Sequence, residues 1–232
     1  MNLALGLCGL GEAKAALRGA AELGYRAVQL DGAAPGMRAR ELDRSGRRDL
    51  AAMMRRLGLG LAGVDLWVPT EHFAPGPHTE RAVHAVICAL ELVGELATMA
   101  GGRAVVSVSM GAGAAADAKV ALREAEERAG ARLADHQWPP AAGCGVGIDP
   151  AAVMLAGGEP ATEVLRLAEA PAAARLSDLG PVGRVPAGRG KLDVMGYEVA
   201  LVTRGYVSPV VLDVRGLADA WGEAAARAPG AG

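Results

Sequence analysis

Residues 3–31, with the sequence LALGLCGLGEAKAALRGAAELGYRAVQLD, contain one complete strand–helix–strand unit. A short apolar run at 3–7 precedes a segment at 12–23 with apolar residues at helical spacing, and a second apolar run follows at 25–30. Strands that alternate with helices in this way lie parallel, and each helix crosses back over the sheet. The unit therefore predicts an α/β fold built on a parallel sheet.

The same alternation continues through the rest of the chain. Further strands are predicted at 59–68, 104–109, 131–134, 145–148, 173–176 and 210–214, and further helices at 47–57, 79–100, 116–129, 161–168 and 193–204. Eight strands in a chain of 232 residues are typical of a small (β/α)8 TIM barrel, whose active site lies at the carboxyl ends of the strands. We therefore predict one TIM barrel domain over residues 1–226 and a flexible tail over residues 227–232.

The connection between the fifth and sixth predicted strands is unusually short. Between Asp135 and Cys144 the sequence is only HQWPPAAG, whereas a parallel crossover normally needs about a dozen residues or more. We predict that the helix between these two strands is missing or is replaced by a short loop.

Composition and charge argue against several classes of protein. The 24 basic and 26 acidic side chains give a net charge of −2, which provides no basic field for a nucleic-acid backbone. The three cysteines are far apart, the N-terminus lacks the basic region of a signal peptide, and we find no apolar run of the ~18 residues that span a bilayer. We expect a cytoplasmic protein with no nucleic-acid or membrane partner, as a monomer or a homo-oligomer.

The first strand–helix–strand unit also imitates a dinucleotide-binding fingerprint. Gly9 and Gly11 open the helix, and Asp31 ends the second strand 20 residues after Gly11. The third glycine of the fingerprint is replaced by Lys14, whose long side chain does not suit the close contact of helix and strand. A plain turn is the favoured interpretation, and a nucleotide-linked enzyme remains the lesser alternative.

Acidic side chains follow several of the predicted strands. In a barrel these groups would meet at one mouth, where buried charges need a cation, a substrate or each other. Asp178 alone could equally cap a helix or form a surface salt bridge, but the set as a whole indicates a functional site. Its members are Asp31, Asp135, Asp149, Asp178 and Asp213, and His136 adjoins Asp135.

Two loops add candidate ligand-binding side chains. The sequence GVDLWVPTEHF after the third strand carries Trp67 and His72, either as a ligand wall or as an anchor over the barrel rim. The Gly/Pro-rich segment after the seventh strand carries Arg184 and Arg189, and guanidinium groups in such a loop suit phosphate or carboxylate. For Arg184 we expect a solvated surface position.

The order of these segments resembles the sugar phosphate isomerase/epimerase family, the xylose isomerase-like TIM barrels, and the chain looks like a divergent member. The resemblance runs over nearly the whole chain. In chain order the similar segments are LGYRAVQLD (23–31), LGLGLAGVDLWVP (57–69), GVGIDPAAVMLAGGEP (145–160), ARLSD (174–178), VPAGRGKLD (185–193) and YVSPVVLDVRG (206–216).

The resemblance implies a divalent metal, which would be Mn, Mg, Co or Zn. The metal would polarise the carbonyl of a sugar or sugar phosphate while carboxylates move a proton at the neighbouring carbon. It implies Asp149, Asp213 and either Asp135 or His136 as ligands, with Asp213 and Asp135 also acting as acid and base. The side chains expected to bind the carbohydrate are Arg175, Arg189, His72, Trp67 and Asp31.

One departure from the family divides the possible functions in two. The family has a metal-ligating histidine after its seventh strand, and Arg175 stands there; a guanidinium has no lone pair to offer a metal. In the first hypothesis the remaining ligands still hold a metal, and the protein is a working isomerase or epimerase. In the second, Arg175 pairs with Asp149 or Asp213 in place of the metal, and the protein is a metal-free, non-catalytic pseudoenzyme that binds a sugar or an anion. Contacts between Arg175 and these acids would favour the second.

Overall fold

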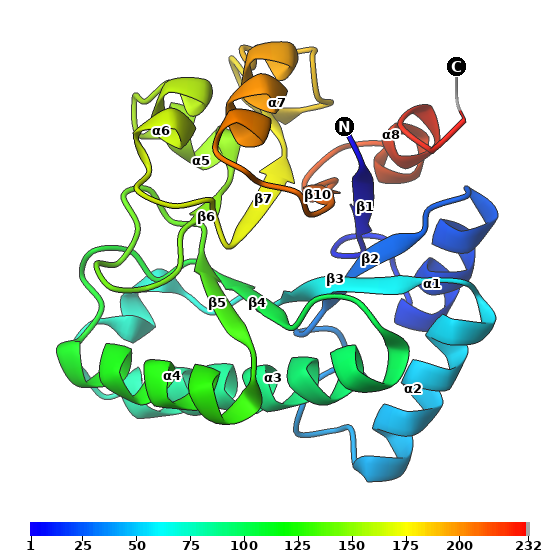
Figure 1. Cartoon of the computed structure of the whole chain (residues 1–232), viewed down its shortest axis with the longest axis vertical. Coiled ribbons are helices and arrows are strands. Elements are labelled where there is room, and N and C mark those ends of the chain that lie inside the picture. The colour runs from blue at the N-terminus through cyan, green and yellow to red at the C-terminus, as the bar shows by residue number, and fades with distance from the viewer. Residues whose placement is uncertain (231–232) are drawn as a thin grey trace.

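Within residues 1–230, which the computed structural model describes, eight parallel strands curve into a nearly closed barrel, as predicted (Figure 1). The last two residues of the predicted tail lie outside the described residues. The barrel strands are β1 (Leu3–Gly6), β2 (Ala27–Asp31), β3 (Gly60–Asp65), β4 (Val105–Val108), β5 (Arg132–Asp135), β6 (Gly147–Ile148), β7 (Ala173–Leu176) and β10 (Val210–Leu212).

Helices alternate with the strands and cover the outside of the barrel (Figure 1). They are α1 (Ala13–Glu22), α2 (Arg44–Arg56), α3 (Thr79–Ala100), α4 (Ala116–Ala129), α5 (Pro150–Leu155), α6 (Pro160–Arg166), α7 (Val194–Thr203) and α8 (Ala220–Ala226), with a 3₁₀ turn, η1 (Thr70–Phe73), before α3. The sequence does not predict α5 and α8, which have six and seven residues.

The barrel closes between β5 and β6. Neighbouring strands pair in the order β5-β4-β3-β2-β1-β10-β7-β6, and the two ends meet through a parallel bridge between Asp135 and Val146. There the Asp135 amide donates to the Gly145 carbonyl at 2.9 Å. Residues 136–146 join the two strands without a helix, which confirms the predicted short loop.

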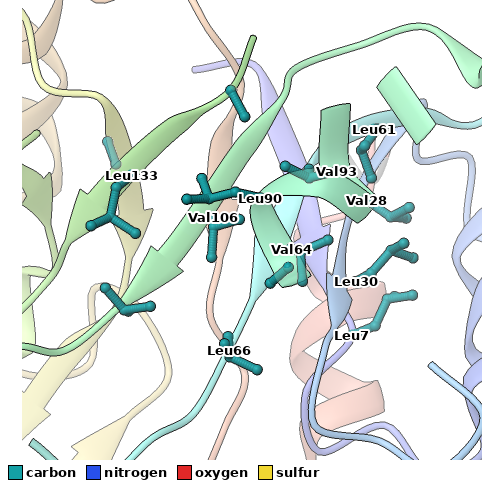
Figure 2. Packing of buried hydrophobic residues seen from close by; sticks show 14 of the residues in the cluster. Leu7, Val28, Leu30, Leu61, Val64, Leu66, Leu90, Val93, Val106 and Leu133 are labelled. Carbon is teal, nitrogen blue, oxygen red and sulfur yellow. The ribbon is translucent and has the colours of Figure 1, made fainter. Parts of the chain in front are cut away.

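The main hydrophobic core lies between the barrel and its helices. Outward-facing strand residues such as Val28, Val64 and Val106 belong to one buried cluster with Leu90 and Val93 of α3 (Figure 2). By length and composition α3 could cross a membrane, contrary to our expectation that no apolar run is long enough. In the fold it packs against β3, β4, α2 and α4, so its apolar residues are those of a core helix.

Small side chains line the amino end of the barrel interior. They form two clusters, one of Ala4, Ala62 and Val211 and the other of Val105, Ala134 and Ala173. Since side chains alternate between the two faces of a strand, the next inward positions toward the carboxyl end are two residues further along. These positions carry Arg175 on β7, Asp213 after β10 and His136 after β5. The strand register therefore points polar groups into the mouth of the barrel.

An antiparallel hairpin follows β7, where the sequence predicts only a loop. Strand β8 (Asp178–Gly180) pairs with β9 (Gly183–Val185). Gly183 adopts φ 129°, a backbone conformation that glycine tolerates and other residues rarely adopt. The hairpin carries Arg184 back to the carboxylates of the barrel mouth.

Candidate functional site

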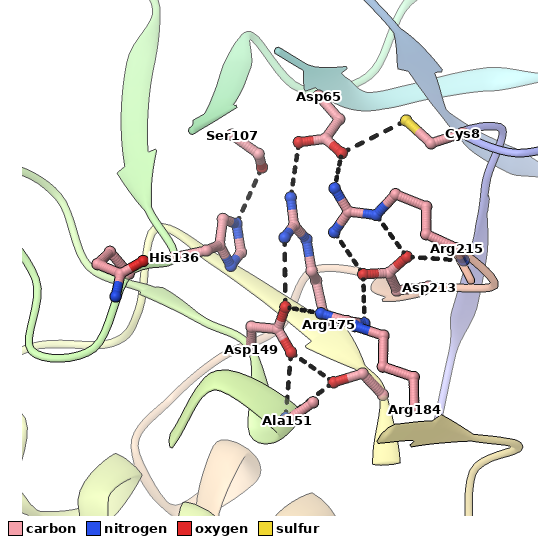
Figure 3. A network of polar contacts seen from close by, with 12 residues as sticks. Cys8, Asp65, Ser107, His136, Asp149, Ala151, Arg175, Arg184, Asp213 and Arg215 are labelled. Carbon is pink, nitrogen blue, oxygen red and sulfur yellow. Dashed lines mark hydrogen bonds and ion pairs between the residues drawn. The ribbon is translucent and has the colours of Figure 1, made fainter. Parts of the chain in front are cut away.

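Three aspartates and three arginines alternate in a closed ring at the carboxyl end of the barrel (Figure 3). We call it the Asp–Arg ring. Each aspartate accepts hydrogen bonds from two arginines, and each arginine donates to two aspartates. In order around the ring the residues are Asp65, Arg175, Asp149, Arg184, Asp213 and Arg215.

Arg175 is the most deeply buried arginine of the ring. Its Nη2 donates to Asp65 Oδ1 at 2.7 Å, and its Nη1 lies 3.4 Å from Asp149 Oδ2. Its side chain is 3% exposed, and those of the two aspartates are 5% and 4% exposed. Arg175 thus contacts Asp149, one of the two acids that the second hypothesis names, while its second partner is Asp65 rather than Asp213.

Arg184 and Arg215 close the ring on the solvent side. Arg184 donates to Asp149 at 2.6 Å and to Asp213 at 2.9 Å. Arg215 donates to Asp65 at 2.8 Å and to Asp213 through both Nη2 at 2.5 Å and Nε at 2.8 Å. Both side chains are 27% exposed, so these are the ring cations that solvent reaches.

The ends of the strands hold the three aspartates in place. Asp65 is the last residue of β3, Asp213 follows β10, and Asp149 follows β6. Asp149 also caps α5, because its Oδ1 accepts from the Ala151 amide at 3.1 Å. The Ser177 hydroxyl donates to the same oxygen at 2.5 Å. Asp149 is therefore fixed by local structure as well as by the arginines.

The arginines favour the ionised form of Asp149 and Asp213. Burial alone would raise the pKa of Asp149, but the nearby charges of Arg184 and Arg175 outweigh it and hold that pKa well below its ordinary value. Burial likewise opposes ionisation of Asp213, and the hydrogen bond from Arg215 with the charges of Arg175 and Arg215 lowers the pKa of Asp213. The ring pairs three acidic with three basic side chains, so their formal charges balance.

His136 lies beside the ring, inside the barrel. Its Nε2 is 3.0 Å from the Ser107 hydroxyl (Figure 3). That hydroxyl accepts a hydrogen bond from Gln29 at 2.9 Å. Burial and the charge of Arg175 lower the pKa of His136 well below its ordinary value, so the imidazole is neutral. Its Nδ1 and the Nε of Arg175 are buried, and neither has a hydrogen-bond partner among the described residues.

Asp135 is not part of the ring. Its Oδ1 accepts from the amides of Met110 and Gln137 at 2.8 and 3.0 Å, and its Oδ2 accepts from those of Gly111 and Ala141 at 3.0 and 2.7 Å. This carboxylate therefore organises the loops after β4 and β5. The geometry assigns Asp135 to loop structure and gives it no contact with the groups at the mouth.

Alternation along β5 explains this placement. Leu133 belongs to the core outside the barrel and Ala134 to a cluster inside it. Asp135 therefore faces outward and His136 inward. Of the two residues that the resemblance offers after the fifth strand, only His136 lies within the barrel.

Asp178 is held in the same manner as Asp135. It lies in β8 and is 1% exposed. Its carboxylate organises the segment between the hairpin and α7 and makes no contact with the ring. Four backbone amides donate to it, those of Leu179, Gly188, Gly190 and Leu192.

Four other predicted ligand-binding residues also lie outside the ring. Asp31 accepts from the amides at positions 33 and 34 in its own turn. Arg189 is exposed on the loop after β9. His72 lies in η1 with its ring 4.5 Å from that of His78, and Trp67 is 70% exposed beside a separate cavity. The sequence-predicted set thus contributes Arg175, Asp149 and Asp213 to the ring.

Sequence reasoning misses the other half of the ring. Asp65 falls inside the predicted strand 59–68 rather than at its end, which conceals it. Arg215 lies two residues after Asp213 and so on the same face, a spacing that could have indicated it. The expectation for Arg184 is wrong, because the unpredicted hairpin turns it from solvent onto Asp149 and Asp213.

The residues of the mouth do not fit a divalent metal. A metal would need free lone pairs of carboxylate or imidazole, but two arginines bind each of the three ring carboxylates, and a guanidinium offers none. Arg175 itself occupies the space between Asp65 and Asp149. Among residues 1–230 no cluster of three His, Cys, Asp or Glu side chains has a geometry suited to a metal.

Comparison with solved structures identifies the same fold in known proteins. A xylose isomerase domain protein from Planctomyces limnophilus is 16% identical with a TM-score of 0.70, over 97% of this chain and 93% of that chain. The IolI protein, solved with a bound zinc atom, is 14% identical with a TM-score of 0.68, over 91% and 88% of the two chains. A D-allulose 3-epimerase from Methylomonas sp., solved in complex with D-allulose, is 14% identical with a TM-score of 0.58, over 91% and 83%.

These similarities confirm at the level of the fold the resemblance seen in the sequence. No protein-family model and no curated protein matches the chain. The chain has the xylose isomerase-like TIM barrel fold, and its structural neighbours include a xylose isomerase domain protein, an L-ribulose 3-epimerase and a D-allulose 3-epimerase.

Proposed function

We propose that this protein is a metal-independent carbohydrate-binding protein, whose ligand is a sugar that carries a carboxylate or phosphate group. The observation that carries the proposal is the guanidinium of Arg175, which lies between Asp65 and Asp149 inside the barrel. It stands where the resemblance implies a metal-ligating histidine. A guanidinium there balances the carboxylates as a cation would, which favours the second of the two hypotheses drawn from the sequence.

The protonation of the mouth favours binding over proton transfer. A general base works best when its pKa lies near the operating pH. The pKa values of Asp149 and Asp213 lie below the ordinary value, because arginine charges and hydrogen bonds outweigh burial. The pKa of His136 is lowered by burial and by Arg175. None of these three groups is poised to take up and return a proton at neutral pH.

An anionic group is the part of a ligand that the ring recognises best. A ligand entering from solvent meets Arg184 and Arg215, whose side chains are 27% exposed. Guanidinium groups bind carboxylate and phosphate through two parallel hydrogen bonds. Both arginines also share Asp213, so an incoming anion would exchange with that carboxylate. The complex of a neighbour of the same fold with D-allulose supports a carbohydrate as the rest of the ligand.

A ligand panel measured in the presence of a chelator tests the proposal. Gluconate and ribulose 5-phosphate are expected to raise the melting temperature, and the neutral sugar D-allulose to raise it less. The variant Arg184→Gln should lose the effect of the anionic sugars. Arg189→Gln, which removes an exposed arginine from the same loop without touching the ring, should keep it.

Two results would contradict the proposal. One is an absence of stabilisation by every anionic sugar in the panel. The other is isomerase or epimerase turnover that appears with added Mn²⁺, Co²⁺ or Zn²⁺ and disappears with the chelator, which would establish the metal-dependent enzyme instead.

A further inference from the structure

A cavity lies outside the barrel, between the loops that follow β2 and β3 and the amino-terminal half of α3. Its volume is about 250 Å³, and none of the six ring residues lines it. The cavity is therefore separate from the Asp–Arg ring at the mouth of the barrel. Its apolar lining comes from Val64, Leu66, Ala85, Ala89 and Leu92.

The rim of this cavity is positively charged. Arg38, Arg40 and Arg81 line it, and no acidic residue of the described chain does. Arg38 is partly engaged, because it donates to Glu41 at 2.9 Å. Arg40 and Arg81 are exposed, and within residues 1–230 neither forms a salt bridge. Two guanidinium groups are thus free to bind an anion at the edge of an apolar pocket.

Trp67 supplies a flat apolar wall. It follows β3, lines the cavity and leaves 70% of its surface exposed. A large aromatic side chain left in solvent beside a pocket is typical of a binding surface. The chain has only three tryptophans and one phenylalanine, so this exposed indole is unusual for its composition.

We propose that this cavity binds a small aromatic carboxylate. The ring of the ligand lies against Trp67 and the apolar lining, and its carboxylate accepts hydrogen bonds from Arg81 or Arg40. A cavity of about 150 Å³ holds benzene, so 250 Å³ accommodates one aromatic ring with its acid group. The site and the mouth of the barrel would then take different ligands.

Calorimetric titration with benzoate tests the proposal, with two analogues that each lack one feature. Benzyl alcohol keeps the ring without the charge, and acetate keeps the charge without the ring. Benzoate is expected to bind once per chain with a dissociation constant of about 1 mM or lower. Each analogue should bind about tenfold more weakly or worse, because it loses either the stacking or the charge-assisted hydrogen bond.

Variants locate the benzoate site. Trp67→Ala and Arg81→Gln change exposed side chains, so both should fold, and each should weaken benzoate binding about tenfold. Arg18→Gln, which removes an exposed arginine of α1 outside the cavity, is the matched control and should bind like the parent. Benzoate binding that is absent in the parent, or unchanged in both cavity variants, would overturn the proposal.

Discussion

The Asp–Arg ring and the loop centres at Asp135 and Asp178 bury the same chemical group and neutralise it differently. In the ring, each carboxylate is bound by two guanidinium groups, and two of the ring's three guanidinium groups reach solvent. At Asp135 and Asp178, four backbone amides surround the carboxylate, and its role is to fix loops. A buried carboxylate after a barrel strand is therefore a candidate for a ligand site only where its partners are side chains that can also bind a ligand.

The largest effect is expected from Arg175→Met, which removes the buried guanidinium from the ring. Asp65 and Asp149 would each lose one of two positive partners inside the barrel. Breaking a buried pair in this way costs about 3–5 kcal/mol of the free energy of unfolding, measured by urea denaturation. Arg175→Lys, which keeps the charge, should cost less. A loss below about 1 kcal/mol would show that Arg175 is not the central cation of the ring.

The corresponding change in a loop centre is Asp135→Asn. The asparagine amide has nearly the shape of the carboxylate but presents N–H groups to two of the four backbone donors. We expect a loss of about 1–3 kcal/mol in the free energy of unfolding. Binding of anionic sugars should be unchanged. A variant with parental stability that fails to bind them would place Asp135 in the site and erase the distinction between the two regions.

The free energy of unfolding is expected to depend on pH through His136, which lies beside the ring. Burial and Arg175 hold its pKa below the ordinary value of about 6.5. The unfolded chain therefore takes up the proton first as the pH falls, and the stability present above pH ~6.5 declines below it, by up to about 1.4 kcal/mol per pH unit. The variant His136→Asn should lose this decline between pH ~6.5 and ~5. The exposed-site control His84→Asn should retain it, and an equal slope in both variants would contradict the assignment.

The smallest effect is expected at the rim of the ring, in Arg184→Gln. The Arg184 side chain is 27% exposed. We therefore expect the variant to lose only about 1 kcal/mol of the free energy of unfolding at neutral pH. The pKa values of Asp149 and Asp213 are lowered in the folded state, so their contribution is present above pH ~4 and is lost as the pH falls further. The difference between parent and variant should shrink in that acid range. Arg189→Gln should match the parent throughout, and a constant difference for Arg184→Gln would contradict the account.

The barrel could be predicted because the alternation of strands and helices is a local property of the sequence. The hairpin of β8 and β9 is not predicted, because its strands have only three residues each, too few to show a clear alternation. The polar residues near the carboxyl ends of the strands indicate the mouth, since Asp149, Asp213 and Arg175 all belong to the ring.

The face of the strand on which an acidic side chain lies, rather than its position at the strand end, determines whether it belongs to the ring. Asp135 ends β5, and its place in the sequence therefore predicts a site residue, but Leu133 and Ala134 set the alternation that turns it outward. The same alternation places Arg215 with Asp213 and could have identified it. The alternation of side chains does not identify Asp65. Gly63 lies at an irregular point in the pairing of β2 and β3, and this irregularity disturbs the period of two.

The central claim is that the guanidinium of Arg175 takes the place of a metal in this barrel. The most direct test is metal content by plasma mass spectrometry, after incubation of the purified protein with Mn²⁺, Co²⁺ or Zn²⁺ and removal of the excess. The account predicts far less than one metal ion per chain, with no difference between the parent and Asp149→Ala. About one ion per chain that is lost in Asp149→Ala and in Asp213→Ala would contradict it.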